Sequence, residues 1–143
     1  MAMNIKPEID KLVDQINFEA KSRAFRAANE LRNSALTVLR GQRSGRVYKR
    51  PFSSSKYTAS APGEPPAVRS GDLRRSWRQK TASESTGKGL TVKPAITTDV
   101  KYAPWLNDGT EDGHIAPRPF EDPIIEDAKP KIKAIYSEPY LNK

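Results

Sequence analysis

The stretch PEIDKLVDQINFEAKSRAFRAANELRNSALTVLR, residues 7–40, determines the architecture of this chain. Pro7 suits the first turn of a helix, Glu8 would lie near the positive end of the helix dipole, and Gly41 ends the pattern. Apolar residues recur between these limits in steps of three and four, as on one face of an α-helix. They are Ile9, Leu12, Val13, Ile16, Ala20, Ala24, Ala27, Ala28, Leu31, Ala35, Leu36, Val38 and Leu39. We therefore expect one long amphipathic helix over residues 5–41.

The expected helix is too long for the rest of the chain to cover. At 1.5 Å per residue, residues 7–40 would extend about 50 Å, which exceeds what a single domain of 143 residues can bury. Part of the apolar stripe should therefore contact another subunit. The alanine-rich middle, residues 20–35, suits close approach of a second helix or a sheet, with Phe18 and Phe25 at its margins.

The composition favours a single domain that buries part of its surface against neighbouring subunits of an assembly. The 143 residues include 36% hydrophobic residues, 29% charged residues and twelve prolines, so the apolar material is concentrated in a few elements. Cysteine is absent, which excludes disulfides, thiolate nucleophiles and most zinc sites. No apolar run approaches the roughly 20 residues of a membrane span, and no signal peptide is recognisable. We expect a protein without a membrane partner that is made in the cytoplasm.

Positive charge is concentrated in the first half of the chain. The net charge is +8; residues 1–60 hold twelve Lys/Arg against five Asp/Glu, and residues 61–143 hold thirteen against twelve. No acidic residue occurs between Glu30 and Glu64. Such a segment, with aromatic residues among the cations, is attracted to polyanions or to acidic protein surfaces. The alternative is a solvated loop. The candidate contacts to a partner or to DNA in a channel are Arg40, Arg43, Arg46, Lys49, Arg50 and Lys56.

Residues 42–69 form the basic, proline-rich segment that follows the helix. No helical or strand period is sustained there, so we expect an extended arm or long loop, with short strands near Val47-Tyr48 and Tyr57-Thr58. The tract APGEPP, residues 61–66, should be a stiff connector.

The sheet is expected within residues 70–120. Residues 73–81 suggest a helical turn running into a strand, residues 86–89 a turn, and residues 90–97 a half-buried strand that completes an antiparallel hairpin, with Pro94 at an edge or bulge. Residues 102–106 form an aromatic patch, residues 107–110 and 112–113 read as turns, and residues 115–120 as a short strand.

A second amphipathic helix is expected over residues 121–138. Asp122-Pro123 resembles an N-cap followed by proline, and Pro130 should kink or restart the helix. The whole chain, residues 1–143, is then a single α+β domain. Its small antiparallel sheet is flanked by a long N-terminal and a shorter C-terminal helix, with a long basic loop.

Patterns that could support catalysis or metal binding are weak. His114 is the only histidine, so a histidine-based triad or multi-histidine metal site cannot form within one chain. A carboxylate nuclease could be built from Asp72, Asp99 and Lys101, but an Asp-x-Lys pattern is common in charged proteins. The acidic residues 108–112 lack the spaced ligands of a calcium loop, and a solvated turn is favoured. We expect no enzyme, cofactor or metal.

Several segments, taken in order, resemble the head-tail joining (neck or tail-completion) proteins of long-tailed bacteriophages. They are the APGEPPAVRSGDLRRS string of residues 61–76, Tyr102-Ala103, Leu106, Gly109-Thr110 and the APRPF string of residues 116–120. The resemblance covers residues 5–138. It departs from the family at Asn107, where a glutamate is usual before the Gly-Thr turn, and at Pro130, which interrupts a commonly smoother helix.

The resemblance implies a virion protein rather than an enzyme. Copies would form a ring, a hexamer or a dodecamer, between the head-completion or connector proteins and the tail terminator or tail tube, around packaged double-stranded DNA. Assembly would take place in the cytoplasm of the bacterial host. Structural turns and anchors would be Gly71, Leu73, Gly109, Arg118 and Phe120. The alternative function is a nucleic-acid-binding protein that uses residues 40–56.

Overall fold

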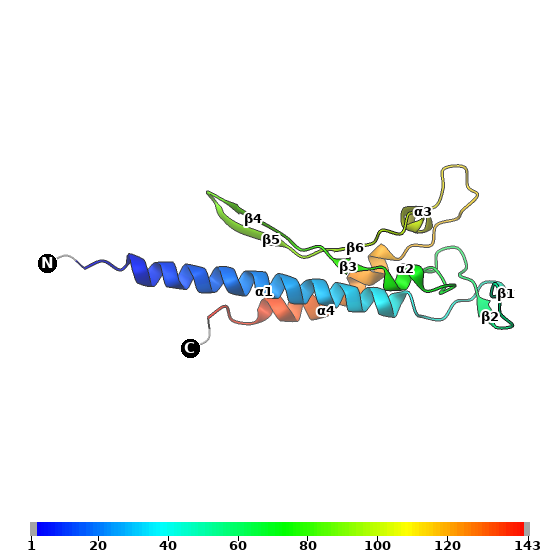
Figure 1. Cartoon of the computed structure of the whole chain (residues 1–143), viewed down its shortest axis with the longest axis horizontal. Helices are drawn as coiled ribbons and strands as arrows, with labels where there is room; N and C mark the ends of the chain where they lie inside the picture. Colours follow the sequence, from blue (N-terminus) through cyan, green and yellow to red (C-terminus); the bar gives the residue numbers. More distant parts are fainter. Residues whose placement is uncertain (1–2, 142–143) are drawn as a thin grey trace.

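The computed structural model describes residues 3–141 and has the expected α+β class. A long N-terminal helix, a C-terminal helix and small antiparallel strand pairs form an elongated molecule (Figure 1). The helices are α1 (Lys6–Val38), α2 (Asp72–Arg75), α3 (Ala103–Asp108) and α4 (Glu121–Ser137). The strands are β1 (Val47–Lys49), β2 (Lys56–Thr58), β3 (Arg78–Gln79), β4 (Ala82–Thr86), β5 (Gly89–Lys93) and β6 (Ile96–Thr97).

Helix α1 pairs with α4 through its alanines. The two helices run in opposite directions along the C-terminal half of α1 (Figure 1). Ala24, Ala27, Ala28 and Ala35 are completely buried. A methyl group allows close approach of two backbones, and of the two neighbours expected from the sequence, a second helix or a sheet, α4 is the one that packs here. None of the helices within residues 3–141 carries an apolar stretch sufficient to cross a membrane.

Helix α4 runs without interruption through Pro130, so the restart expected there is wrong. Ile124, Ala128 and Ile135 are buried and hold the helix in place on both sides of the proline. Pro130 itself is exposed. The carbonyl that loses its helical hydrogen bond to proline therefore lies on the solvent side, where water can replace the donor.

The N-terminus of α4 is capped from outside the helix. Phe120, not Asp122, is at the cap position, and no side chain of the helix caps its own first turn. Asn107 at the end of α3 accepts hydrogen bonds through its Oδ1 from the backbone N–H groups of Phe120 (3.0 Å) and Glu121 (3.1 Å). Two of the unpartnered donors at the helix start are thereby satisfied. Asn107 thus has a structural role in this chain.

The strands form three two-stranded antiparallel pairs, so the expectation of one small sheet is wrong. β3–β6 and β4–β5 are successive parts of one long hairpin, joined by a hydrogen bond from Lys80 N–H to Ala95 O of 2.8 Å. Pro94 has no N–H to donate, and the ladder is interrupted beside it. The predicted hairpin turn at residues 86–89 is confirmed, with Thr86 opposite Gly89.

Residues 115–120 do not form the predicted strand. Pro117 and Pro119 lack N–H donors, and in this stretch the Arg118 N–H donates to Leu106 O at 2.6 Å. Of the aromatic patch at residues 102–106, Tyr102 is the N-cap of α3 and residues 103–106 lie in the helix. The turn expected at residues 107–110 begins only at Gly109. An apolar pattern over so few residues does not show whether a neighbouring strand is available for pairing.

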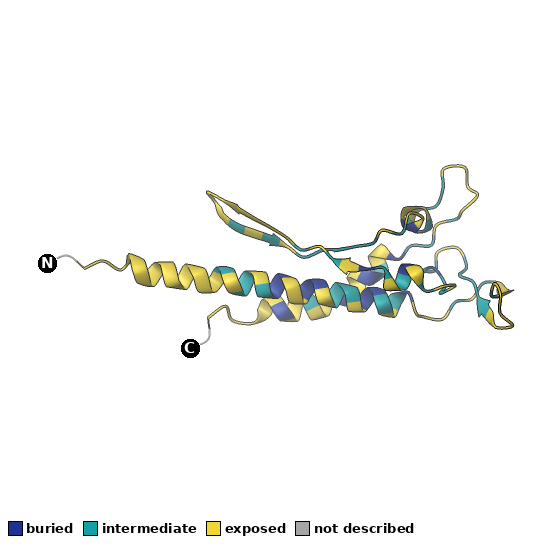
Figure 2. Cartoon of the chain, in the orientation of Figure 1, coloured by how far each residue is buried: buried dark blue, intermediate teal, exposed yellow. Residues whose placement is uncertain are grey.

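The core lies where the C-terminal end of α1, α2, α3 and the start of α4 meet (Figure 2). Trp77 and Phe120 are in contact at its centre, edge to face, with 6.0 Å between ring centroids. Leu73 from α2 is also buried there. The buried residues of this cluster are Ala35, Leu39, Leu73, Trp77, Ala103, Phe120 and Ile124.

Gly109 is required by the turn that follows α3, and Gly109→Ala should lower the free energy of unfolding by about 2 kcal/mol. Its φ of 78° and ψ of −179° are accessible essentially to glycine alone. A Cβ there would also lie 2.8 Å from Ile115 O and 3.0 Å from Pro117 Cδ. Urea denaturation followed by circular dichroism measures the change.

The matched control is Gly87→Ala in the β4–β5 turn. A Cβ at Gly87 meets nothing within 4 Å, and the stability of this variant should stay close to that of the wild type. Equal losses for the two alanine variants would contradict the role assigned to Gly109.

Candidate functional site

The N-terminal half of α1 carries an uncovered apolar stripe. Ile9, Leu12, Val13 and Ile16 are 39–48% exposed. Figure 2 shows the reason: α4 ends before it reaches this part of α1, whose residues are mostly exposed. The sequence predicted that the helix would exceed what the rest of the chain can bury, and in the single chain it does.

The chain returns to α1 after α4 and is held there by Arg23, which is fully buried. Its guanidinium donates to Glu138 O (2.5 Å), Pro139 O (2.6 Å) and Glu19 Oε1 (3.0 Å), and it lies 3.9 Å from the centroid of the Tyr140 ring. Sequence reasoning missed this role. The available signal was an arginine on the same helical face as the buried alanines.

A shallow groove of about 610 Å³ lies between α1 and residues 140–141; we call it the tail groove. Its apolar lining includes Phe18, which is largely exposed. Two carboxylates, Asp14 and Glu19, also line it, and the second is paired with Arg23. The tail groove is therefore both apolar and acidic.

The basic segment contains the two short strands that the sequence predicted. β1 and β2 pair in antiparallel register, with Tyr48 opposite Tyr57 and Lys49 opposite Lys56. The tyrosine rings are 6.0 Å apart between centroids. This hairpin lies at the end of the molecule opposite the N-terminus (Figure 1).

The basic segment is a loop braced against the body rather than an extended arm. The Gly45 N–H donates to Ala59 O (2.8 Å) at the base of the hairpin. The Gly63 N–H donates to Pro117 O (3.1 Å), and Arg118 Nε donates to Ser60 Oγ (2.9 Å). Hydrogen bonds to distant parts of the chain thus fix a segment that has no regular periodicity.

The six candidate cations divide into two groups. Arg43 donates to Val38 O (2.7 Å) and Pro66 O (3.1 Å), and burial lowers the pKa of its guanidinium. Arg50 donates to the carbonyls of Val68 and Arg69 and lies over the Tyr57 ring. These two arginines therefore have structural roles, because their donors are used in hydrogen bonds to backbone carbonyls of the same chain.

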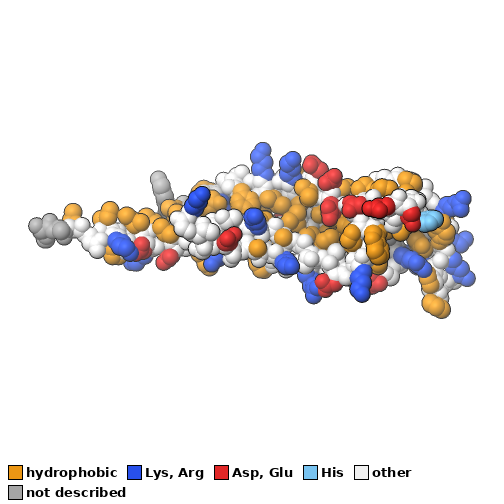
Figure 3. Space-filling view, turned by 90° about the horizontal axis from the view of Figure 1, so that it is seen from above, with side chains coloured by type: hydrophobic (Ala, Val, Ile, Leu, Met, Phe, Trp, Pro, Cys, Tyr) orange, Lys and Arg blue, Asp and Glu red, His pale blue; other side chains and the backbone are white. Residues whose placement is uncertain are grey.

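The other four cations are exposed: Arg40, Arg46, Lys49 and Lys56. None of them forms an ion pair with residues 3–141. Figure 3 shows Lys and Arg side chains gathered at this end of the molecule, whereas hydrophobic side chains line the protruding end of α1. The two ends of the molecule therefore differ in chemistry.

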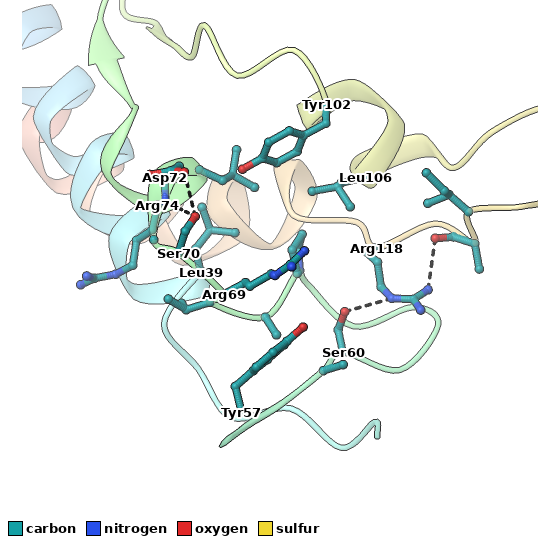
Figure 4. Close-up of a pocket in the computed structure, with 18 of the residues that line it drawn as sticks. Leu39, Tyr57, Ser60, Arg69, Ser70, Asp72, Arg74, Tyr102, Leu106 and Arg118 are labelled. Atoms are coloured by element: carbon teal, nitrogen blue, oxygen red, sulfur yellow. Dashed lines mark hydrogen bonds between the residues drawn. The ribbon is translucent and has the colours of Figure 1, made fainter. Parts of the chain in front are cut away.

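A larger groove of about 770 Å³ separates the basic segment from α2, α3 and residues 114–118. Gly71, with φ 85°, starts α2 at its edge. Arg118 bonds Ser60 and the carbonyl of Ala116 there, rather than an acidic partner. Figure 4 shows Arg69 extending through the groove between Tyr57 and Tyr102.

The carboxylates considered for catalysis or metal binding are in separate interactions. Asp99 pairs with Arg78, and Asp72 accepts a hydrogen bond from Ser70 Oγ (2.8 Å). Asp112 accepts from Thr110 Oγ1 (2.5 Å) and the His114 N–H (3.1 Å), which lowers the pKa of its carboxyl. Across residues 3–141, no three acidic or histidine side chains converge as metal ligands would.

Comparison with known proteins does not narrow the range of functions for this chain. No protein-family model, curated protein or solved structure matches this chain. Its function is therefore inferred from its own surfaces. Three surfaces distinguish the chain: the uncovered half of α1, the tail groove and the cationic β1–β2 hairpin.

Glu64 joins two parts of the basic segment through hydrogen bonds, and its side-chain carboxyl should have an unusually low pKa. Its carboxylate accepts hydrogen bonds from the hydroxyl and N–H of Ser44 and from the Ala61 N–H, which lowers its pKa from 4.5 to about 2. Because the folded-state pKa is depressed, this contribution to stability is present above pH 4.5 and is lost as the pH falls toward 2.

Carboxyl NMR measures the titration of Glu64 directly. The Ser44→Ala variant removes the hydroxyl, which is the strongest of the three donors, and should move the pKa of Glu64 back toward its usual value. A wild-type pKa near 4.5 would show that the hydrogen bonds from Ser44 and Ala61 do not persist in solution.

Proposed function

We propose that this protein is a structural subunit of the neck of a long-tailed bacteriophage. Copies form a ring that joins the head connector to the tail tube and continues the DNA channel. The ring extends the passage, seals it and offers a docking face to the tail. The observation that carries the proposal is the continuous apolar stripe on the N-terminal half of α1, which is left 39–48% exposed in the single chain.

Physical chemistry favours a protein neighbour for this part of α1. Apolar surface is stabilised by removal from water, by about 1.5–3 kcal/mol for each fully buried Ile, Leu or Val side chain. Contiguous apolar patches on soluble proteins commonly mark interfaces. A homo-oligomer with closed symmetry supplies the same neighbour to every copy, so that no copy retains an exposed stripe.

The order of elements also supports the proposal. A long helix, a proline-glycine tract, a Gly-Asp-Leu-Arg turn at α2, a hairpin and a C-terminal helix follow one another as the resemblance to neck proteins implies. The four exposed cations of the basic segment could face packaged DNA in such a ring. Contacts to phosphates by mobile Lys and Arg side chains do not depend on sequence, which would let the DNA slide.

The proposal is tested by Leu12→Asp, which places a charge in the middle of the uncovered stripe. Leu12 contributes to no core cluster in the single chain. The variant should therefore keep the unfolding temperature of the wild type but lose ring assembly on the connector and incorporation into virions. Mass photometry of the assembly mixture and immunoblotting of purified particles measure the two losses.

The matched control is Ile125→Asp, which changes a similarly exposed residue on α4. This variant should assemble like the wild type. If wild-type protein is absent from finished particles and forms no ring, the proposed function is wrong.

A second candidate function is nucleic-acid binding through residues 40–56. It is favoured by the four cations without ion pairs in the described chain, and by the exposed Tyr48 and Phe52 among them. Such a protein would bind duplex DNA at low salt and lose affinity steeply as salt rises. A neck subunit would instead be recovered with the connector.

A further inference from the structure

The tip of the β1–β2 hairpin presents an aromatic ring to solvent. Phe52 is fully exposed and has a φ of 56°, which is unfavourable for a residue with a bulky side chain. The turn is nevertheless closed by hydrogen bonds from Arg50 N–H to Ser55 O (2.8 Å) and from Ser53 N–H to Arg50 O (3.3 Å). The fold thus holds an apolar side chain outward, unburied by the described part of the chain.

Positive charge surrounds this ring. Arg46, Lys49 and Lys56 are exposed and without ion pairs to any residue between 3 and 141, and the two lysines are directly opposite each other in the strand register. Arg50 instead braces the tip through the carbonyls of Val68 and Arg69. We call residues 46–56 the hairpin tip; it has an apolar end, and exposed cations lie along its strands.

The tail groove at the other end of the molecule has the complementary chemistry. Leu12, Phe18, Tyr140 and Leu141 provide apolar surface around a space of about 610 Å³, large enough for a phenyl ring. Asp14 on the groove wall has no ion-pair partner in the described part of the chain. Glu19 adds a second carboxylate beside it, although Arg23 already bonds it.

We propose that the hairpin tip of one copy docks into the tail groove of the next. Phe52 enters the apolar space beside Phe18, and the lysines of the tip face Asp14. The contact joins two unlike surfaces, so it is head-to-tail, and repeated contacts of this kind close into rings when the rotation per subunit allows. The inference rests on the proposed ring and identifies the second copy as the occupant of the groove.

The absence of cysteine makes disulfide trapping a direct test. Phe52→Cys and Phe18→Cys are prepared as separate variants, mixed at high concentration and oxidised, and the products are separated by non-reducing electrophoresis. A covalent pair should form in the mixture at least tenfold more than in either variant alone. Tryptic peptides that join positions 52 and 18 identify the bond by mass spectrometry.

Charge exchange provides an independent test that needs no cross-link. Asp14→Lys should weaken self-association at least tenfold in sedimentation equilibrium, and the combination with Lys49→Glu and Lys56→Glu should restore it. The matched control, Asp127→Lys, reverses an exposed carboxylate on α4 outside the groove and should have no effect. Circular dichroism spectra of all variants should match that of the wild type.

The outcomes separate this inference from the proposed function. If rings form but the mixed disulfide does not exceed the single-variant background, the docking inference is wrong and the neck proposal stands. If the mixed disulfide forms but the products are open polymers that never close, the docking inference stands and the ring is wrong. If no association occurs even at the solubility limit, and no ring forms on the connector or in particles, both are wrong. Occupation of the groove by a different protein, in particles that contain closed rings, would also overturn the docking inference.

Discussion

Replacing Phe120 with alanine should lower the free energy of unfolding by about 3–5 kcal/mol. Phe120 is 1% exposed and lies edge to face against Trp77. It also stands at the start of α4, where the core joins α1, α2 and α3. Truncation would lose both the transfer free energy of the ring and its contacts, and would leave a cavity that neighbouring backbone cannot fill.

Urea denaturation of Phe120→Ala measures the loss, and Phe52→Ala is its matched control. The second variant removes the same ring from a fully exposed position, so the free energy of unfolding should hardly change. The pair thereby separates a packing effect from any general effect of removing phenylalanine. A loss below 1 kcal/mol for Phe120→Ala would place Phe120 outside the core of the protein in solution.

The second large effect is expected at Arg23, where Arg23→Met should cost about 3 kcal/mol of stability. Methionine can fill most of the volume but cannot donate hydrogen bonds. The carbonyls of Glu138 and Pro139 would lose their donor, and the Glu19 carboxylate would lose its cation. Residues 138–141 should then leave α1, and their amide hydrogen exchange should accelerate.

Arg26→Met provides the comparison because Arg26 binds the same stretch of chain from the surface. Its guanidinium donates to both carboxylate oxygens of Glu138, at 2.9 and 2.7 Å. These hydrogen bonds raise the pKa of Arg26 and lower that of Glu138. Both side chains are exposed, so water can replace the pair and the effect should be much smaller. Equal effects of the two substitutions would refute the anchoring role of Arg23.

The sequence predicted the helices well because their patterns extend over many turns. The expected range 5–41 compares with Lys6–Val38 for α1, and 121–138 with Glu121–Ser137 for α4. The alanine spacing also indicated a close neighbour, which proved to be α4. Strands were predicted less well because an alternation over a few residues does not specify a pairing partner. The hydrogen-bonded ladder is interrupted beside Pro94, and no strand forms at Pro117 and Pro119, because proline has no N–H to donate.

The site was harder to predict because its hydrogen bonds join distant residues. Sequence identified the cations of residues 40–56 but could not separate the bracing arginines, Arg43 and Arg50, from the exposed ones. Their acceptors are backbone carbonyls of Val38, Gln42 and residues 66–69, and a carbonyl has no signature in sequence. For the same reason, the sequence did not show that Arg23 anchors the segment after α4 or that Asn107 caps α4.

The pairing of α1 with α4 has a consequence for how the protein is made. Among the helices of residues 3–141, the first to be synthesised is the partner of the last, since α1 begins at Lys6 and α4 ends at Ser137. Until α4 has been synthesised, the alanine face of α1 lacks the helix against which it packs, so closure of the core must await residues 121–137. A chain that ends before residue 120 would therefore lack both Phe120 and α4, and the buried alanines of α1 would be left exposed to water.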